Sequence, residues 1–135
     1  MRMNISSGRS WESLVGYSRA VRVGSIVVTA GTAPAGEDGR VVTPGDPYQQ
    51  TLHCLRTIEA ALRQAGAALT DVVQTRLYVT DISRWEEVGR AHGEVFREIR
   101  PATTMVQVSG LIDPDMMVEI EAMAIVDSGI GGTGL

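Results

Sequence analysis

Two acidic side chains close to the C-terminal end of the sequence are the strongest candidates for chemistry. Glu119 and Glu121 lie two residues apart in the largely apolar segment 117–126. In a strand, residues with that spacing point to the same face of the sheet. Two carboxylates on one face can act as acid and base, or one of them can polarise a water molecule. A solvated outer face is the ordinary alternative, although Met117 and Met123, on the same face, favour partial burial.

The histidines, the single cysteine and a pair of threonines give weaker signals. His92 falls on the apolar stripe of an expected helix with no nucleophile motif beside it, so we interpret it as structural. His53 and Cys54 are neighbours that would point in different directions on a helix, and Cys54 is interpreted as a small buried apolar residue. Thr103 and Thr104 follow a proline at the start of an expected strand. Their hydroxyls either reflect β-propensity or hold a ligand oxygen.

The basic residues and the metal-ligating residues exclude several classes of function. All 12 basic residues are arginines, which rules out a lysine Schiff base and a P-loop. One cysteine and two histidines cannot form a closed structural zinc site, which needs four such ligands. We therefore expect no metal and no cofactor. The net charge of −4 and the scattered arginines argue against nucleic acid as a partner.

The pattern of apolar residues predicts one α+β domain in the 135 residues. One helix is expected to begin at Asp46–Pro47 and to end before Gly66. A second is expected to begin with a capping box at Ser83–Glu86 and to end at Arg100–Pro101. The expected strands are a hairpin over 17–30, a short candidate at 40–42, and three more over 71–80, 103–109 and 117–126.

The strands need cover on both faces. Ile26 and Val28 would lie on one face of their strand and Val27 on the other, whereas two helices can cover only one face of a sheet. We therefore expect the open face to be buried by self-association.

The chain is expected to be a single domain over 1–135, with an ordered core of about 14–126 and a flexible, glycine-rich tail over 127–135. The opening residues lack an apolar run, and no stretch approaches the ~20 apolar residues of a membrane span. A soluble cytoplasmic protein with no membrane association is expected.

Several segments, in the right order, resemble the RidA (YjgF) family. Gly16–Val21 and Val28–Gly31 resemble the family's opening PYSQAV and SGQ motifs. Asp71–Asp81 is similar to its central strand DVVKTTVYVTD. Arg100–Thr103 and Val118–Ala122 resemble its closing RPAR and VEIEA motifs. The resemblance covers about residues 14 to 126, almost the whole chain.

This resemblance implies a chorismate-mutase-like α+β fold, a mixed β-sheet with two helices on one face, and a homotrimer with three small-molecule clefts between subunits. The implied activity is hydrolysis of reactive enamines and imines to 2-ketoacids and ammonia. In the family, the arginine of PAR grips the substrate carboxylate with two parallel hydrogen bonds. A glutamate of the EIEA motif orients the attacking water, and the tyrosine of PYSQ and the glycine of SGQ line the cleft.

Carried across, the resemblance makes Glu119 the catalytic residue and places Tyr17 and Gly31 in the substrate cleft. The position of the carboxylate-gripping arginine is occupied by Thr103, which is kept in the substrate-binding set together with Met105.

Two further positions depart from the family pattern. Arg19 replaces the glutamine of PYSQ and, two residues from Tyr17, is a candidate for a relocated cation. Gly89 stands where members often carry asparagine.

The lost arginine leaves more than one function open, because a hydroxyl cannot replace a charged two-pronged contact. The first reading is an enamine or imine deaminase, or a related C–N hydrolase, with Thr103 counting against the classical activity on 2-imino acids. The second is a non-catalytic metabolite-binding or regulatory protein. The third, an endoribonuclease or translation inhibitor, is opposed by the acidic pI of about 5.1 and the scattered arginines.

Overall fold

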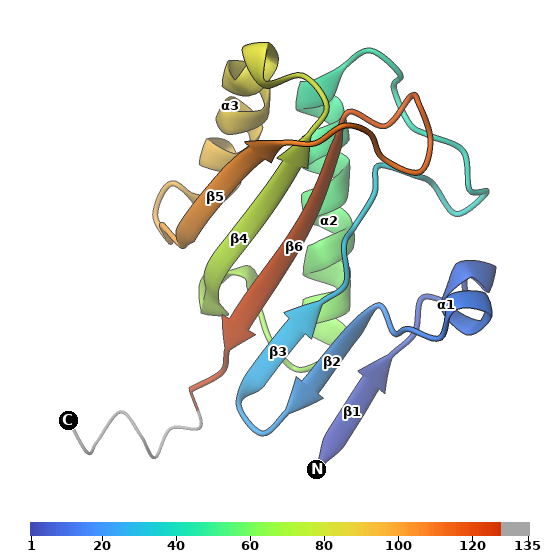
Figure 1. The fold of residues 1–135 in the computed structure, drawn as a ribbon. Coiled ribbons are helices and arrows are strands. Elements are labelled where there is room, and N and C mark those ends of the chain that lie inside the picture. The colour runs from blue at the N-terminus through green and yellow to red at the C-terminus, as the bar shows by residue number, and fades with distance from the viewer. Residues whose placement is uncertain (128–135) are drawn as a thin grey trace.

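A computed structural model of the chain describes residues 1–127, which form one mixed sheet with helices packed against it (Figure 1). The strand order is β1-β2-β3-β6-β4-β5. All neighbours are antiparallel except β4 and β5, which are parallel. The strands are β1 Arg2–Ile5, β2 Ala20–Val23, β3 Ile26–Thr29, β4 Val72–Val79, β5 Ala102–Gln107 and β6 Val118–Ile125.

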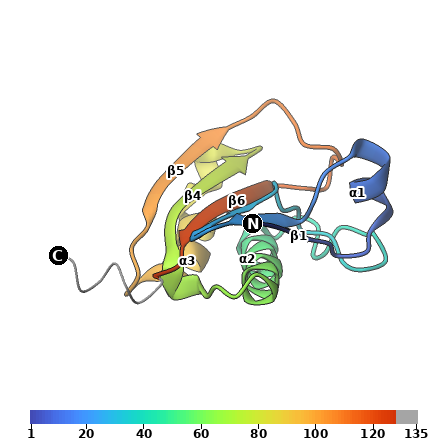
Figure 2. The same ribbon diagram turned by 90° about the horizontal axis from the view of Figure 1, so that it is seen from below.

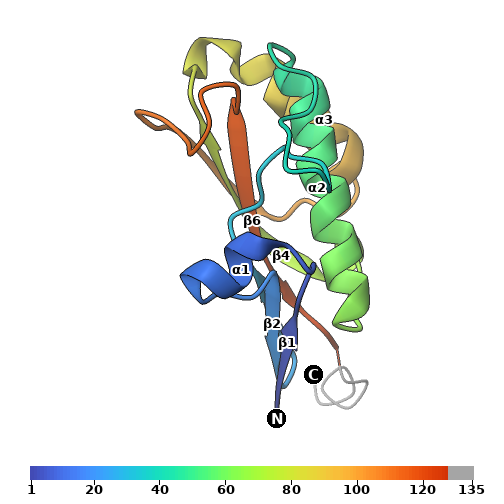
Figure 3. The same cartoon turned by 90° about the vertical axis from the view of Figure 1, so that its right-hand side faces the viewer.

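Two long helices cover one face of this sheet, as expected. These are α2, Pro47–Gln64, and α3, Trp85–Phe96, which lie on the same side of the strands in Figures 2 and 3. The short helix α1, Ser10–Val15, lies on the opposite side of the strands in Figure 3. Two 3₁₀ turns, η1 Leu69–Asp71 and η2 Ile82–Arg84, precede β4 and α3.

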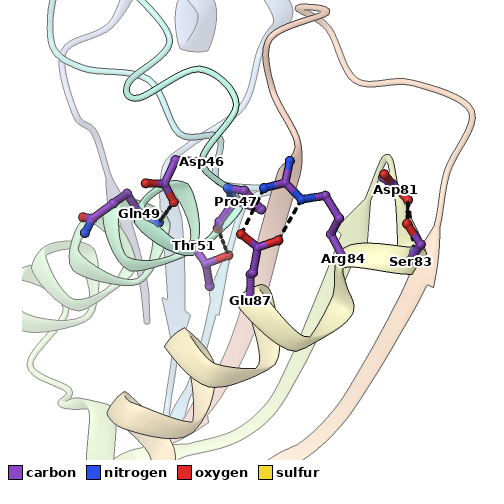
Figure 4. A network of polar contacts seen from close by, with 8 residues as sticks. All are labelled: Asp46, Pro47, Gln49, Thr51, Asp81, Ser83, Arg84 and Glu87. Carbon is purple, nitrogen blue, oxygen red and sulfur yellow. Dashed lines mark hydrogen bonds and ion pairs between the residues drawn. The ribbon is translucent and has the colours of Figure 1, made fainter.

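Helix α2 begins and ends where its sequence predicts. The Asp46 carboxylate accepts a hydrogen bond from the Gln49 backbone N–H at 3.0 Å, and Pro47 occupies the first turn. The Thr51 hydroxyl donates to the Pro47 carbonyl at 2.7 Å (Figure 4). Just after the helix, Gly66 has a φ of +80°, the left-handed conformation that glycine adopts easily at a helix end.

The predicted capping box at the start of α3 is wrong. Asp81 accepts hydrogen bonds from both the backbone N–H and the hydroxyl of Ser83, at 3.0 and 2.5 Å. The Ser83 hydroxyl is therefore committed to Asp81, a 3₁₀ turn forms first, and the helix begins at Trp85. An Arg84–Glu87 ion pair at 2.7 Å closes the first turn instead (Figure 4).

The first 15 residues hold two elements that the sequence did not predict, β1 and α1. They are only four and six residues long, and most of their side chains are exposed, so they are too short for a periodic apolar pattern to stand out. The buried Glu12 carboxylate fixes α1 by accepting hydrogen bonds from Ser6 and Ser7. The sheet thus begins at Arg2 and not near residue 14. The strand candidate at 40–42 forms only an isolated bridge, between Ala35 and Val41.

The hydrophobic core lies between the sheet and the two long helices. Val27, Leu77 and Ile120 of the sheet are fully buried there, against residues such as Leu62 of α2. The opposite face is open: Val28 is 43% exposed, whereas Val27 next to it is 0% exposed.

Within the described part of the chain, no helix combines the length and the apolar character of a membrane span. The expected tail lies outside the described residues, apart from Asp127.

Candidate functional site

Strand β6 presents the two candidate carboxylates on the open face of the sheet, as their spacing predicts. Val118, Ile120 and Ala122 are buried toward the helices, whereas Glu119 and Glu121 are half-buried on the other side. The two carboxylates differ in their hydrogen-bond and ion-pair partners.

Glu121 is engaged by its neighbours on β4. Its carboxylate lies 3.7 Å from the Arg76 guanidinium and accepts a short hydrogen bond from the Tyr78 hydroxyl. That hydrogen bond raises the pKa of Tyr78, with burial adding to the effect. Arg76 is the direct cross-strand partner of Glu121, whereas Tyr78 is opposite Glu119 and reaches Glu121 diagonally. Glu121 therefore connects β6 to two side chains of β4 on the open face of the sheet.

Glu119 has no hydrogen bond or ion pair with any described residue of the chain. Burial raises the pKa of its carboxyl group; the nearby Arg19 charge acts in the opposite direction, and Glu121 raises it further. Desolvation disfavours the ionised form of a carboxyl group. A half-buried carboxylate with no bonded partner and a raised pKa suits proton transfer to or from a ligand.

Gly31 lies directly against this carboxylate. A Cβ atom on Gly31 would approach the carboxyl carbon of Glu119 to 3.1 Å and one carboxylate oxygen more closely still. The neighbouring Thr32 holds the loop to β6 through two backbone hydrogen bonds with Ile120, of 2.7 and 3.0 Å. Only a residue without a side chain fits there while Glu119 keeps this position.

Arg19 supports the same loop from the other side. Its side chain is buried, and one guanidinium nitrogen donates to the Gly31 carbonyl oxygen at 2.6 Å. The guanidinium carbon lies 5.9 Å from the centre of the Tyr17 ring. The Nε–H of Arg19 is buried without a hydrogen-bond partner in the described chain. Tyr17, Arg19, Gly31 and Glu119 thus form one group, which we call the Glu119 cluster.

A cavity of about 340 Å³ opens beside this cluster. Tyr17 and Ser18 line it together with residues of β1, β2 and β3, including Asn4 and Val28. Gly31 and Glu119 are not part of its wall.

Thr103 and Met105 lie on the other face of the sheet. In the parallel pairing of β4 with β5, Thr103 is opposite Thr75 and Met105 is opposite Leu77. Because Thr75 and Leu77 are fully buried toward the helices, Thr103 and Met105 also face the helix side. Met105 packs against the hydrophobic core. A single chain therefore does not bring these two residues to the Glu119 cluster, and their part in ligand binding stays a prediction.

A series of hydrogen bonds through two hydroxyl groups connects Thr103 to His92 of α3. The Thr103 hydroxyl donates to the Pro101 carbonyl at 3.0 Å and lies 2.8 Å from the Thr75 hydroxyl. Thr75 in turn lies 2.9 Å from Nε2 of His92. His92 also packs its ring against Phe96, and burial lowers its pKa. These contacts agree with a structural histidine.

Thr103 also borders a second open cavity, of about 390 Å³, at the end of α3. Thr75, Arg97 and Arg100, which belong to this region, carry no sequence signal that predicted a functional role for them. The pairing of Thr75 with Thr103 depends on the register of two parallel strands, which spacing along the chain does not reveal. Cys54, by contrast, is fully buried as expected, and burial raises the pKa of its thiol. Within the described residues, no three metal-ligating side chains come together.

Comparison with known proteins places these features in context. The profile of the family described as endoribonuclease L-PSP matches residues 8–126. A crystal structure from Mycobacterium tuberculosis, of a member of the YjgF/YER057c/UK114 family, is 56% identical. It superposes with a TM-score of 0.85 over 93% of this chain and 100% of that chain.

Two curated relatives are similar to almost the whole chain. An uncharacterized protein of Streptomyces coelicolor is 37% identical over 120 residues, which are 89% of this chain and 89% of that protein. The 3-aminoacrylate deaminase RutC of Acinetobacter baylyi is 37% identical over 111 residues, covering 82% of this chain and 87% of the relative.

Proposed function

Because this chain belongs to the endoribonuclease L-PSP family, also known as the YjgF/RidA family, we propose that it hydrolyses small enamines or imines through Glu119. The observation that carries the proposal is the state of this carboxylate: half-buried, without a bonded partner in the described chain, and resting on Gly31. The similarity to a 3-aminoacrylate deaminase supports the substrate class.

The proposed reaction needs one acid–base group. A substrate that arrives as an enamine takes a proton from solvent on carbon and becomes an iminium ion. Water then adds to the iminium carbon: a C–O bond forms, the C=N electron pair moves to nitrogen, and Glu119 accepts the proton that the water loses. Glu119 returns this proton to the amino nitrogen, the C–N bond breaks as the hydroxyl oxygen forms the C=O bond and releases its proton to solvent, and the carbonyl product and ammonia leave. Proton transfer by a positioned side chain contributes about 10²–10⁴-fold to such rates.

Two polar groups beside Gly31 have no hydrogen-bond partner in the described chain. The Nε–H of Arg19 is a buried donor without a partner, and Glu119 is an acceptor without one, within the described chain. Both side chains contact Gly31. Buried polar groups are nearly always hydrogen-bonded, often through ordered water. Of the two, the Arg19 Nε–H exposes no surface to water, so the attacking water would be held by the half-buried Glu119 carboxylate.

We also propose that the complete cleft forms between the subunits of a homotrimer. The Glu119 cluster and the Thr103 cavity lie on opposite faces of one chain, so only contact between copies can bring them together. The open sheet face is apolar enough for such contact: Val23, Ile26 and Val28 are 51%, 47% and 43% exposed. The mass in solution tests this directly. Three times the 14.5 kDa chain mass is expected, and a monomer mass would contradict it.

The single unpaired cysteine fits a reducing compartment, and we propose the cytoplasm as the location.

One observation favours a second function, a non-catalytic metabolite-binding protein. The Thr103 hydroxyl is already bonded to Pro101 and Thr75, so this position offers a ligand neither a charge nor a free donor. A cleft built this way could bind a metabolite without turning it over.

A coupled assay separates the two functions. An amino-acid oxidase generates 2-imino acids, semicarbazide traps what remains, and lost semicarbazone reports hydrolysis. Wild type is compared with Thr103→Arg and with the control Thr70→Arg, whose exposed side chain lies in η1, outside the sheet.

The deaminase proposal expects hydrolysis by wild type and by Thr70→Arg. Activity only in Thr103→Arg would show that the acid–base machinery works and that the native ligand is not a 2-imino acid. No activity in any of the three would favour the binding protein.

A further inference from the structure

We propose that the cavity at the end of α3 binds the anionic group of a small ligand, with Arg100 as the main cation and Arg97 as the second. The cavity has a volume of about 390 Å³, which is at the small end of the range for ligand sites. Its lining includes two arginines, His92 and Thr103, and no acidic residue. In a chain with a net charge of −4, this is a local concentration of positive charge that attracts anions.

The two guanidinium groups are available to a ligand. Arg100 uses only its Nε–H, which donates to the Arg97 carbonyl at 3.2 Å. Among the described residues, no hydrogen bond or ion pair occupies the other nitrogens of Arg100 or any side-chain nitrogen of Arg97. Glu94, one turn earlier, accepts a hydrogen bond from Tyr48 at 2.6 Å instead. Two unpaired guanidinium groups can grip a carboxylate or a phosphate through paired N–H donors.

The backbone at Arg100 points to a need for its side chain. Arg100 has a φ of +57°, a left-handed conformation that is unfavourable for residues with a Cβ atom. It also precedes Pro101, and a following proline disfavours compact conformations of the preceding residue. Glycine is the usual residue at such a helix end, and this chain does place Gly66 after α2. After α3 the same conformation is adopted by an arginine on the wall of a cavity.

Thr103 offers a ligand neither a positive charge nor a free hydroxyl proton. The second point follows from the direction of its hydrogen bonds. Its single hydroxyl proton is donated to the Pro101 carbonyl, because a carbonyl can only accept. The Thr75 hydroxyl must then donate to Thr103, and Nε2 of His92 must carry the proton that Thr75 accepts. Thr103 therefore has no hydroxyl proton left to donate to a ligand in the cavity. An anion in this cavity must be held by the arginines.

The inference deepens the proposed function, since it gives the substrate a negatively charged group. To that extent it rests on the proposed function, but binding can be measured without turnover. Glu119→Gln should keep its anion binding while losing hydrolysis, so that failure of one proposal is distinguishable from failure of the other.

The decisive variant is Arg100→Gly. Glycine adopts a φ of +57° without strain, so the variant should fold while lacking the guanidinium group. The control is Arg63→Gln, which removes an exposed arginine paired with Glu59 on α2. Wild type and both variants are titrated with pyruvate, with inorganic phosphate and with the neutral propionamide. Binding is followed by NMR of the arginine Nε–H groups.

Saturable shifts of the Arg97 and Arg100 signals with pyruvate or phosphate, and none with propionamide, are expected for wild type. Whichever anion binds more tightly identifies the group as carboxylate or phosphate. Arg100→Gly should weaken binding at least about tenfold, and Arg63→Gln should leave it unchanged. Equal affinity in wild type and Arg100→Gly, equal shifts with propionamide, or no saturable shift with either anion would overturn the inference.

Discussion

Replacing Gly31 with alanine should move Glu119 without disturbing the rest of the fold. The φ of Gly31 is outside the left-handed region, so alanine meets no backbone strain and the only conflict is the new methyl group. That group would lie 3.1 Å from the carboxyl carbon of Glu119, whereas carbon atoms pack at about 3.5–4.0 Å. The carboxyl group must therefore withdraw by roughly 0.5–1 Å.

The two consequences differ in size. The displaced group is the free end of a flexible side chain, so relief costs about 0.5–1.5 kcal/mol of rotamer strain. The smaller entropy of an unfolded chain with alanine offsets about 0.4–1 kcal/mol of this. The free energy of unfolding should thus stay within about 1 kcal/mol of wild type. A catalytic group misplaced by about 1 Å can cost about 10²-fold in rate, and we expect a loss of that order.

The assay is the semicarbazide-coupled hydrolysis of 2-imino acids, with urea unfolding for stability. Gly110→Ala is the matched control, because a Cβ atom on Gly110 would meet nothing within 4 Å. Shortening the acid in the double variant Gly31→Ala/Glu119→Asp should recover part of the lost rate. The reasoning is refuted if Gly31→Ala retains the activity of Gly110→Ala, or if it loses stability and activity in proportion.

Three further changes test the electrostatic part of the structure. Folding raises the pKa of Glu119, so the stability from its protonated form is complete below the ordinary glutamate pKa and is lost as pH rises through the raised value. Glu119→Gln should therefore have a higher Tm than wild type at about pH 7 and an equal Tm at about pH 4; an equal Tm at both would be contrary to this. For Glu12, burial raises the pKa, but hydrogen bonds from Ser7 and Ser6 lower it overall, so its stabilisation is present at neutral pH and lost as pH falls through the lowered value. Glu12→Gln should cost about 2 kcal/mol at neutral pH, measured by urea unfolding, and the cost should shrink in acid. Thr75→Val removes the hydroxyl that Thr103 and His92 share and should cost about 1–3 kcal/mol, with Thr75→Ser close to wild type; equal stability of Thr75→Val and wild type would show that these hydrogen bonds do not hold α3 to the sheet.

Features that depend on residues close together in the sequence could be predicted. The alternation along β6 places Glu119 and Glu121 on one face, and Asp46–Pro47 marks the start of α2. Both depend only on the periodicity of a strand or on the cap of one helix. The motifs that resemble a known family pointed to Tyr17 and Gly31, which the structure places in the Glu119 cluster.

Features set by contacts between distant segments could not be predicted. The different environments of Glu119 and Glu121 depend on the direction of the Tyr78 side chain, which is opposite Glu119 across the sheet and donates to Glu121. The hydrogen bond between Thr103 and Thr75 depends on parallel register. Strand β1 is an edge strand of four residues held by backbone pairing with β2, and four residues are too few for their alternation to stand out. The left-handed conformation of Arg100 is likewise invisible in the sequence, since glycine is the residue that normally signals it.

The most direct test of the central claim compares Glu119 with Glu121. Both lie on the same face of β6, but they differ in their hydrogen-bond and ion-pair partners. Ammonia release from enzymatically generated imines is measured for wild type, Glu119→Gln and Glu121→Gln, each purified identically. If Glu119 is the acid–base group and Glu121 serves the sheet surface, Glu119→Gln should lose about 10²–10⁴-fold in rate and Glu121→Gln should stay close to wild type. Equal rates for Glu119→Gln and wild type, or equal losses in both variants, would contradict the assignment.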